Sequence, residues 1–241
     1  MKEIFMASKD QLTQFKNRIF TGALLCILFC TFALPVQVHA KDIPNTLPNL
    51  NTFIESVMDG NASALRGVYV YNVMALAIVQ QPVGNPGYVS TTESVATQFS
   101  IAAEAGNVGL LAHNTLAGSS FSNIKQGSLI ILIYGDGRIE SFMAKSIQHY
   151  QALDPLNPYS EFKDLETQTT FTAEELFNNV YRGEYHLTLQ TCIKNNANTS
   201  WGRLFIVATP IENKNIIRNE KVLSALPGSI YKQMARRIIT K

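Results

Sequence analysis

The residues best suited to covalent chemistry are a cysteine and an arginine that lie eleven positions apart near the end of the sequence. Cys192 ends an alternating run from Tyr185, and Arg203 begins the run that continues as Leu204–Ala208. A thiolate is a nucleophile, and a nearby guanidinium favours the thiolate and offers donors to an oxyanion. The two residues predict attack on a carbonyl, unless Arg203 only caps a strand end at the surface.

A cysteine nucleophile needs a proton partner, and residues 41–241 contain three histidines. His113 is the best candidate because it follows the apolar run Val108–Ala112, and strand ends commonly present site residues. His186 is six positions from Cys192 on one predicted strand, about 20 Å away, and is expected to be a half-exposed strand residue. His149 lies in a polar stretch where no local pattern gives it a role.

Alternating and apolar runs predict the strands that must position these side chains. Antiparallel pairing of the last two runs would bring Cys192 and Arg203 to one rim of a sheet, with Cβ atoms about 4.5–5.5 Å apart if they are direct neighbours. Many strands at short spacing with isolated helices favour a mainly β domain, either a closed barrel or a sandwich. The predicted strand regions are Val68–Val79, Val108–Ala112, Leu129–Tyr134, Ile139–Ile147, Tyr185–Cys192 and Leu204–Ala208.

Three capping-box pairs predict short helices, because a Ser or Thr followed three residues later by Glu is typical of a helix start. Thr52 with Glu55 predicts a helix that ends at Gly60, and Ser90 with Glu93 predicts one that ends before Gly106. Thr172 with Glu175 predicts a third, reaching about Tyr181.

The sequence resembles the sortases, the cysteine transpeptidases of the bacterial cell surface. Thr188–Cys192 reads Thr-Leu-Gln-Thr-Cys and matches the Thr-Leu-X-Thr-Cys signature of that family. Arg203 heads Arg-Leu-Phe-Ile-Val, similar to the family's arginine strand, and Leu110–Asn114 is similar to its histidine motif. The resemblance covers residues 66–211 and implies a closed sortase-like β-barrel of about eight strands with a few short helices.

The resemblance also implies roles for individual residues. Cys192 would attack a backbone carbonyl in a sorting signal similar to Leu-Pro-X-Thr-Gly and form a thioacyl-enzyme. His113 would protonate the leaving amine and deprotonate the incoming one. Arg203 would hydrogen-bond the substrate or the oxyanion, and Thr191 would add a substrate contact. The implied partners are surface proteins that bear a sorting signal and an acceptor amine of the cell envelope or of a pilin, with no metal or organic cofactor.

Other readings of the same residues stay open. An L,D-transpeptidase would carry Ser-His-Gly-Cys with an arginine two positions later, and Leu189-Gln-Thr precedes Cys192 here. Papain-like peptidases place the cysteine before the histidine, the reverse of this order. The non-enzymatic alternative is an exported β-rich binding module in which Cys192 is buried and inert.

Residues 1–40 predict a signal peptide or an uncleaved signal anchor helix. Basic residues precede the apolar run Phe20–Leu34, and Val38-His39-Ala40 places small residues at a cleavage site. In both cases the rest of the chain faces outward. We expect an extracytoplasmic protein of a bacterial cell envelope, either secreted or associated with the membrane through this segment.

Without residues 1–40, the remaining chain has no net charge from Lys, Arg, Asp and Glu, and it has a single cysteine. Residues 41–241 hold 16 Lys and Arg against 16 Asp and Glu, which argues against a general affinity for nucleic acid. Cys192 is the one cysteine after Ala40, so it has no partner for an internal disulfide. The expected organisation is a linker and short helix at 41–65, the barrel at 66–211 and a basic helical extension at 212–241.

Overall fold

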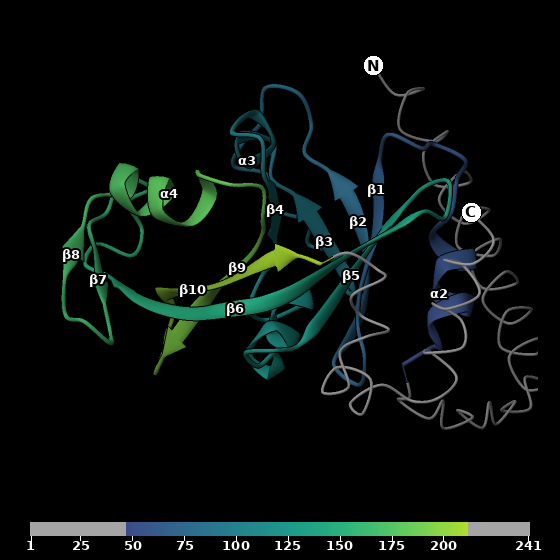
Figure 1. The fold of residues 1–241 in the computed structure, drawn as a ribbon. Helices are drawn as coiled ribbons and strands as arrows, with labels where there is room; N and C mark the ends of the chain where they lie inside the picture. Colours follow the sequence, from purple (N-terminus) through teal and green to yellow (C-terminus); the bar gives the residue numbers. More distant parts are fainter. Residues whose placement is uncertain (1–46, 212–241) are drawn as a thin grey trace, which may run out of the picture. The chain divides into compact units, whose positions relative to one another are not determined.

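The computed structural model describes residues 47–211, which form a β-sheet with four short helices (Figure 1). The helices are α2 (Leu50–Val57), α3 (Ser100–Glu104), the 3-10 helix η2 (Ala117–Asn123) and α4 (Ala173–Tyr181). The strands are β1 (Leu65–Val70), β2 (Met74–Gln80), β3 (Val95–Gln98), β4 (Val108–Leu111), β5 (Leu129–Tyr134), β6 (Ile139–Ala152), β7 (Phe162–Asp164), β8 (Thr170–Phe171), β9 (Leu187–Asn195) and β10 (Asn198–Pro210).

Eight of these strands close into a barrel. Their order is β10–β9–β4–β3–β2–β1–β5–β6, and β6 pairs in turn with β10. β2 with β3 and β4 with β9 are parallel pairs, whereas the other neighbours in the barrel are antiparallel. β7 and β8 continue outward from the far end of β6, beside α4 (Figure 1). The sequence-based prediction of a mainly β, closed barrel of about eight strands is confirmed.

Two apolar layers lie on opposite sides of the strands that matter for the site. Alternate residues of β9 and β10, including Leu187, Leu189 and Leu204, point into the barrel core. Phe205 points the other way and packs with Val180 and Tyr181 of α4. Side chains of β9 and β10 that do not face the core therefore share the outer face that α4 partly covers.

The helix predicted from Ser90 and Glu93 is wrong. Val95–Gln98 instead forms β3, which pairs in parallel with β2, and the helix that follows is limited to α3. The Ser90 backbone N–H donates to the Thr97 hydroxyl, a buried contact that fixes the approach to this strand. Pairing with β2 is a non-local interaction, and it outweighs the local capping signal.

Other expected elements are present, with altered ends. The Thr172–Glu175 capping box starts α4 as predicted. The first helix is capped by Asn49, whose side chain accepts from the Thr52 N–H, so it begins earlier than the predicted Thr52 cap. The run Val68–Val79 is divided between β1 and β2 by a turn in which Asn72 has a φ of 57°.

The predicted leader at 1–40 and the predicted basic extension at 212–241 lie outside the described residues. Between Leu47 and Ile211, no helix combines the length and the apolar character that crossing a membrane requires. The short helix expected within 41–65 is α2, and the first barrel strand begins at Leu65.

Candidate active site

Cys192 and Arg203 are direct cross-strand neighbours. Their Cα atoms are partners in the antiparallel β9–β10 ladder, which confirms the expected pairing of these two positions. The strands extend beyond both residues and turn at Asn196, whose φ of 50° is one that asparagine tolerates. Neighbouring strands lie about 4.8 Å apart, so the guanidinium side chain begins next to the thiol.

His113 extends this pair to a third strand. In the parallel β4–β9 ladder Leu110 is opposite Leu189 and Leu111 is opposite Gln190, and the Ala112 N–H donates to the Gln190 carbonyl at 3.2 Å. β4 ends at Leu111, and His113 follows Ala112 directly, so it comes just after the backbone that contacts Gln190 and Thr191. Cys192 and Arg203 therefore lie at one level of the sheet, and the segment that carries His113 leaves β4 next to β9.

Cys192 and Arg203 also share a face. Leu189 and Ile193 of β9 contact the barrel core, so Cys192 points to the outer side. Leu204 likewise faces the core, which directs Arg203 outward, where its guanidinium lies over the Phe162 ring. Cys192 is a free, half-exposed cysteine. The alternative of a binding module predicted that Cys192 is buried, and this part of that prediction is wrong.

Arg203 is held by the backbone of its own strand and by an aromatic ring. Its Nη1 donates to the carbonyls of Ser200 at 3.0 Å and Gly202 at 2.9 Å. Its guanidinium carbon lies 5.7 Å from the centroid of the Phe162 ring, within cation–π range. Within residues 47–211, Nε and Nη2 have no protein hydrogen-bond partner, so they are the donors that Arg203 can offer to another molecule.

Thr191 lies on the barrel side of β9, with 5% of its surface exposed. Its hydroxyl donates to the Ala112 carbonyl at 2.8 Å and ties the end of β4 to β9. Gly118 of η2 covers this contact so closely that a Cβ there would collide with the Thr191 hydroxyl. The expected contact between Thr191 and substrate does not fit this placement, because the side chain is turned away from the face that carries Cys192.

We predict that Thr191→Val lowers the free energy of unfolding by about 1–3 kcal/mol. Valine keeps the shape of threonine but leaves the buried Ala112 carbonyl without the donor, and an unmet buried polar group costs about that much. Urea unfolding of the wild type, Thr191→Val and Thr191→Ser measures the change. Thr191→Ser retains the hydroxyl, so a valine variant at least as stable as the serine variant would contradict the assigned role of the hydrogen bond.

The other two histidines are not cross-strand partners of Cys192 or Arg203. His186 is buried, not half-exposed as predicted, because the end of α4 covers the start of β9. Its ring nitrogens lie 2.7 Å from the Glu184 carbonyl and 2.9 Å from the Val180 carbonyl. His149 is an exposed residue within β6, not beyond the strand end, and it pairs with core-facing Leu204. His149 thus lies on the opposite face from Arg203.

Cross-strand pairing continues from Arg203 to residues of β6 and β7. Tyr150 of β6 is opposite Arg203, and Asp164 of β7 is opposite Tyr150. Burial, and then the charge of Asp164, raise the pKa of Tyr150 above its usual range. Burial also raises the pKa of Tyr181, whose hydroxyl donates to Gln190 two residues before Cys192. Both phenols stay neutral at physiological pH and act as hydrogen-bond donors.

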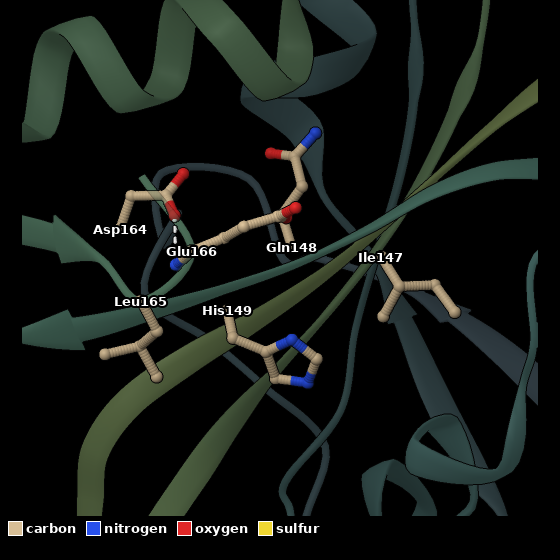
Figure 2. A pocket seen from close by; sticks show the side chains of 6 residues that line it. All are labelled: Ile147, Gln148, His149, Asp164, Leu165 and Glu166. Carbon is tan, nitrogen blue, oxygen red and sulfur yellow. Dashed lines mark hydrogen bonds between the residues drawn. The ribbon is translucent and has the colours of Figure 1, made fainter. Parts of the chain in front are cut away.

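A cavity of about 290 Å³ lies at the junction of β6 and β7 (Figure 2). Figure 2 shows the His149 ring and Leu165 on the opposite side of the β6 ribbon from the Gln148 amide and Asp164. The other lining residues are Ile147 and Glu166. His113, Cys192 and Arg203 do not line this cavity, although Asp164, which is opposite Tyr150, does.

No group of three or more His, Cys, Asp or Glu side chains in the described part of the chain is arranged to hold a metal ion. Asp164, which is opposite Tyr150, has its Oδ1 occupied by the Glu166 and Thr167 N–H groups. The expectation of chemistry without a metal or cofactor stays a prediction.

The supporting residues Asn114, Gly118, Phe162 and Gly202 were not identified from the sequence as part of the site. Each depends on a contact between segments distant in the chain. Thr191 did carry a signal: it shares the parity of Leu187 and Leu189, so alternation along the strand already indicated that it faces the core.

No family model matches the chain, and no curated protein matches it. The solved structures that it matches include sortases of classes A and C. Sortase C1 of Streptococcus agalactiae is 15% identical over 61% of this chain and 67% of that chain, with a TM-score of 0.37. Sortase A of Listeria monocytogenes is 14% identical over 64% and 89%, with a TM-score of 0.39. Sortase C of Streptococcus pneumoniae is 16% identical over 61% and 68%, with a TM-score of 0.40.

Proposed function

We propose that the protein is a sortase-like cysteine transpeptidase in which Cys192 is the nucleophile. The observation that supports the proposal is the cross-strand pair of Cys192 and Arg203, together with the bond that holds the segment before His113 against β9. A nucleophile, a proton carrier and a fixed cation are the three groups that acyl transfer through a thioester needs. The half-exposed state of Cys192 leaves the thiol open to a peptide.

In the proposed first step, the Cys192 thiolate adds to the carbonyl carbon of a substrate peptide bond. Nε or Nη2 of Arg203 donates to the oxyanion that forms. When the C–N bond breaks, His113 gives a proton to the departing amine, and the acyl group remains on sulfur as a thioester. Arg203 suits this role because its guanidinium stays charged and its Nη1 is already anchored to the Ser200 and Gly202 carbonyls.

In the proposed second step, an incoming amine attacks the thioester. His113 accepts the proton that this amine loses, a new amide bond forms and the Cys192 thiolate is released. The thioester intermediate is what allows an amine to compete with water for the acyl group. Thr191 acts indirectly, because its bond to the Ala112 carbonyl holds the segment before His113 against β9.

The proposed donor substrates are surface proteins that carry a sorting signal similar to Leu-Pro-X-Thr-Gly. The proposed acceptor is an amine of the cell envelope or of a pilin. Both follow from the resemblance of Thr188–Cys192 to the sortase signature. The proposed location is the bacterial cell envelope outside the cytoplasm, with residues 1–40 as the signal peptide or membrane anchor, and no cofactor takes part.

The test of this function is transfer of an acyl group to an added amine. We expect the full chain to cleave a sorting-signal peptide, and an added glycine peptide to appear in a new amide product detected by mass spectrometry. The transfer product should increase with amine concentration at the expense of the hydrolysed product. An exported binding module predicts no cleavage at all, and a simple peptidase predicts hydrolysis that the amine does not divert.

A further inference from the structure

Asn114, the residue directly after His113, joins two distant segments of the site. Its Nδ2 donates to the Thr199 carbonyl at 2.8 Å, a contact between residues 85 positions apart. Thr199 lies near the tip of the β9–β10 hairpin, which carries Cys192 and Arg203 on its two strands. The Asn114 side chain therefore links the loop of the proposed proton carrier to the hairpin of the proposed nucleophile.

The β9–β10 ladder is irregular at the hairpin tip, and this leaves backbone carbonyls free to accept hydrogen bonds from side chains. Asn195 is opposite Asn198, but Ile193 is opposite Gly202, so residues 199–201 of β10 fall in a register shift and have no paired residue on β9. A bulge of this kind turns backbone groups away from the neighbouring strand. The Thr199 carbonyl accepts from Asn114, and the Ser200 carbonyl accepts from Arg203.

His113 is held by cross-strand contacts on both of its sides. Before it, the Ala112 carbonyl accepts from the Thr191 hydroxyl and the Ala112 N–H donates to Gln190. After it, the bond from Asn114 to Thr199 is the next link to the hairpin. The bonds of the His113 carbonyl itself, with the Leu116 and Gly118 N–H groups, are local and do not reach β9 or β10.

We propose that Asn114 is a positioning residue that fixes His113 relative to Cys192 through the hairpin tip. This inference rests on the proposed function, since it assigns Asn114 a task within that reaction. Without the bond, the loop after Ala112 loses its side-chain hydrogen bond to the hairpin tip and keeps the packing of η2 against Thr191, so the distance from imidazole to thiol becomes less defined. Asn114 does not itself touch the reacting atoms.

The test is a double-mutant cycle read by alkylation of Cys192, which needs no peptide substrate. Iodoacetamide labelling rates are measured from pH 5 to 9 for the wild type, Asn114→Ala, His113→Ala and the double variant. We expect Asn114→Ala to slow labelling at neutral pH by about 2- to 10-fold, the effect of losing one ordinary hydrogen bond. In the His113→Ala background the same substitution should change the rate little, because its effect passes through His113.

Ser119→Ala is the matched control. The Ser119 hydroxyl donates to the Leu116 carbonyl within the same loop, so this variant also loses an exposed side-chain bond to the backbone but keeps the link to the hairpin. Labelling should proceed at the wild-type rate. An equal slowing by Ser119→Ala, or an Asn114→Ala effect that is absent or independent of His113, would overturn the inference.

Peptide cleavage by the same variants separates this inference from the proposed function. We expect Asn114→Ala to lower kcat with little change in KM, because it disturbs proton transfer and not peptide binding. Coupling in the labelling cycle without any cleavage by the wild type would leave the positioning role intact and refute the transpeptidase. Cleavage by the wild type without coupling would refute the positioning role alone.

Discussion

Replacing Cys192 with alanine should reduce cleavage of a fluorogenic sorting-signal peptide by at least about 1000-fold, the scale on which loss of a covalent nucleophile acts. The described chain offers no second thiol to form the thioester, since Cys192 is its free cysteine. Initial rates at a fixed enzyme concentration, with folding checked by circular dichroism, measure the effect. Cleavage that persists in this variant would remove Cys192 from the mechanism.

The histidines provide the controls for this experiment. His149→Ala should retain nearly all activity, because His149 is exposed on the opposite face from Arg203. His186→Ala should also retain the chemistry, but it removes a buried ring that contacts the Glu184 and Val180 carbonyls, so it must be assayed where it is still folded. A loss equal to that of Cys192→Ala in either folded variant would overturn the assignment of His113.

Gly202→Ala should destabilise the barrel by about 3 kcal/mol or more, near the upper end of what overpacking costs. Gly202 lies where β10 pairs with both β9 and β6, next to Arg203. A Cβ at this position would collide with the Tyr150 carbonyl, and a backbone atom of a paired strand cannot move aside as a flexible side chain can. We therefore expect a much lower urea midpoint and a loss of activity.

Gly87→Ala is the matched control for this substitution. Its added Cβ would meet only the Asn85 Oδ1, at 3.9 Å, which is an ordinary contact. The free energy of unfolding should stay within about 0.5 kcal/mol of the wild type. If Gly202→Ala were as stable as Gly87→Ala, the close approach of β10 to β6 would not be a requirement of the fold.

Local patterns predict those parts of the fold that depend on local interactions. The capping box of Thr172 and the strand regions Leu129–Tyr134 and Ile139–Ile147 were correct, because cap chemistry and hydrophobic runs are contained in neighbouring residues. The pairing of Cys192 with Arg203 was also predictable, since a single short connection joins the two strands. The helix predicted from the capping pair at Ser90 was wrong, because parallel pairing with β2 makes Val95–Gln98 a strand.

The site shows the same division between local and distant contacts. His113 could be chosen from its place after an apolar run, and the β4–β9 register brings the end of that run against β9. The burial of His186 depends on α4, and the bond between Asn114 and Thr199 depends on a hairpin 85 residues later. No periodicity or spacing within either segment carries that information.

The position of β10 sets the order in which the site can be assembled. β10 is the last strand of the barrel in the chain, and it pairs with β9 on one side and β6 on the other. Arg203 lies on this strand, so it becomes the cross-strand neighbour of Cys192 only when the strand that closes the barrel is in place. During synthesis, therefore, Cys192 precedes its cross-strand neighbour, and closure of the barrel and pairing of these two residues are one event.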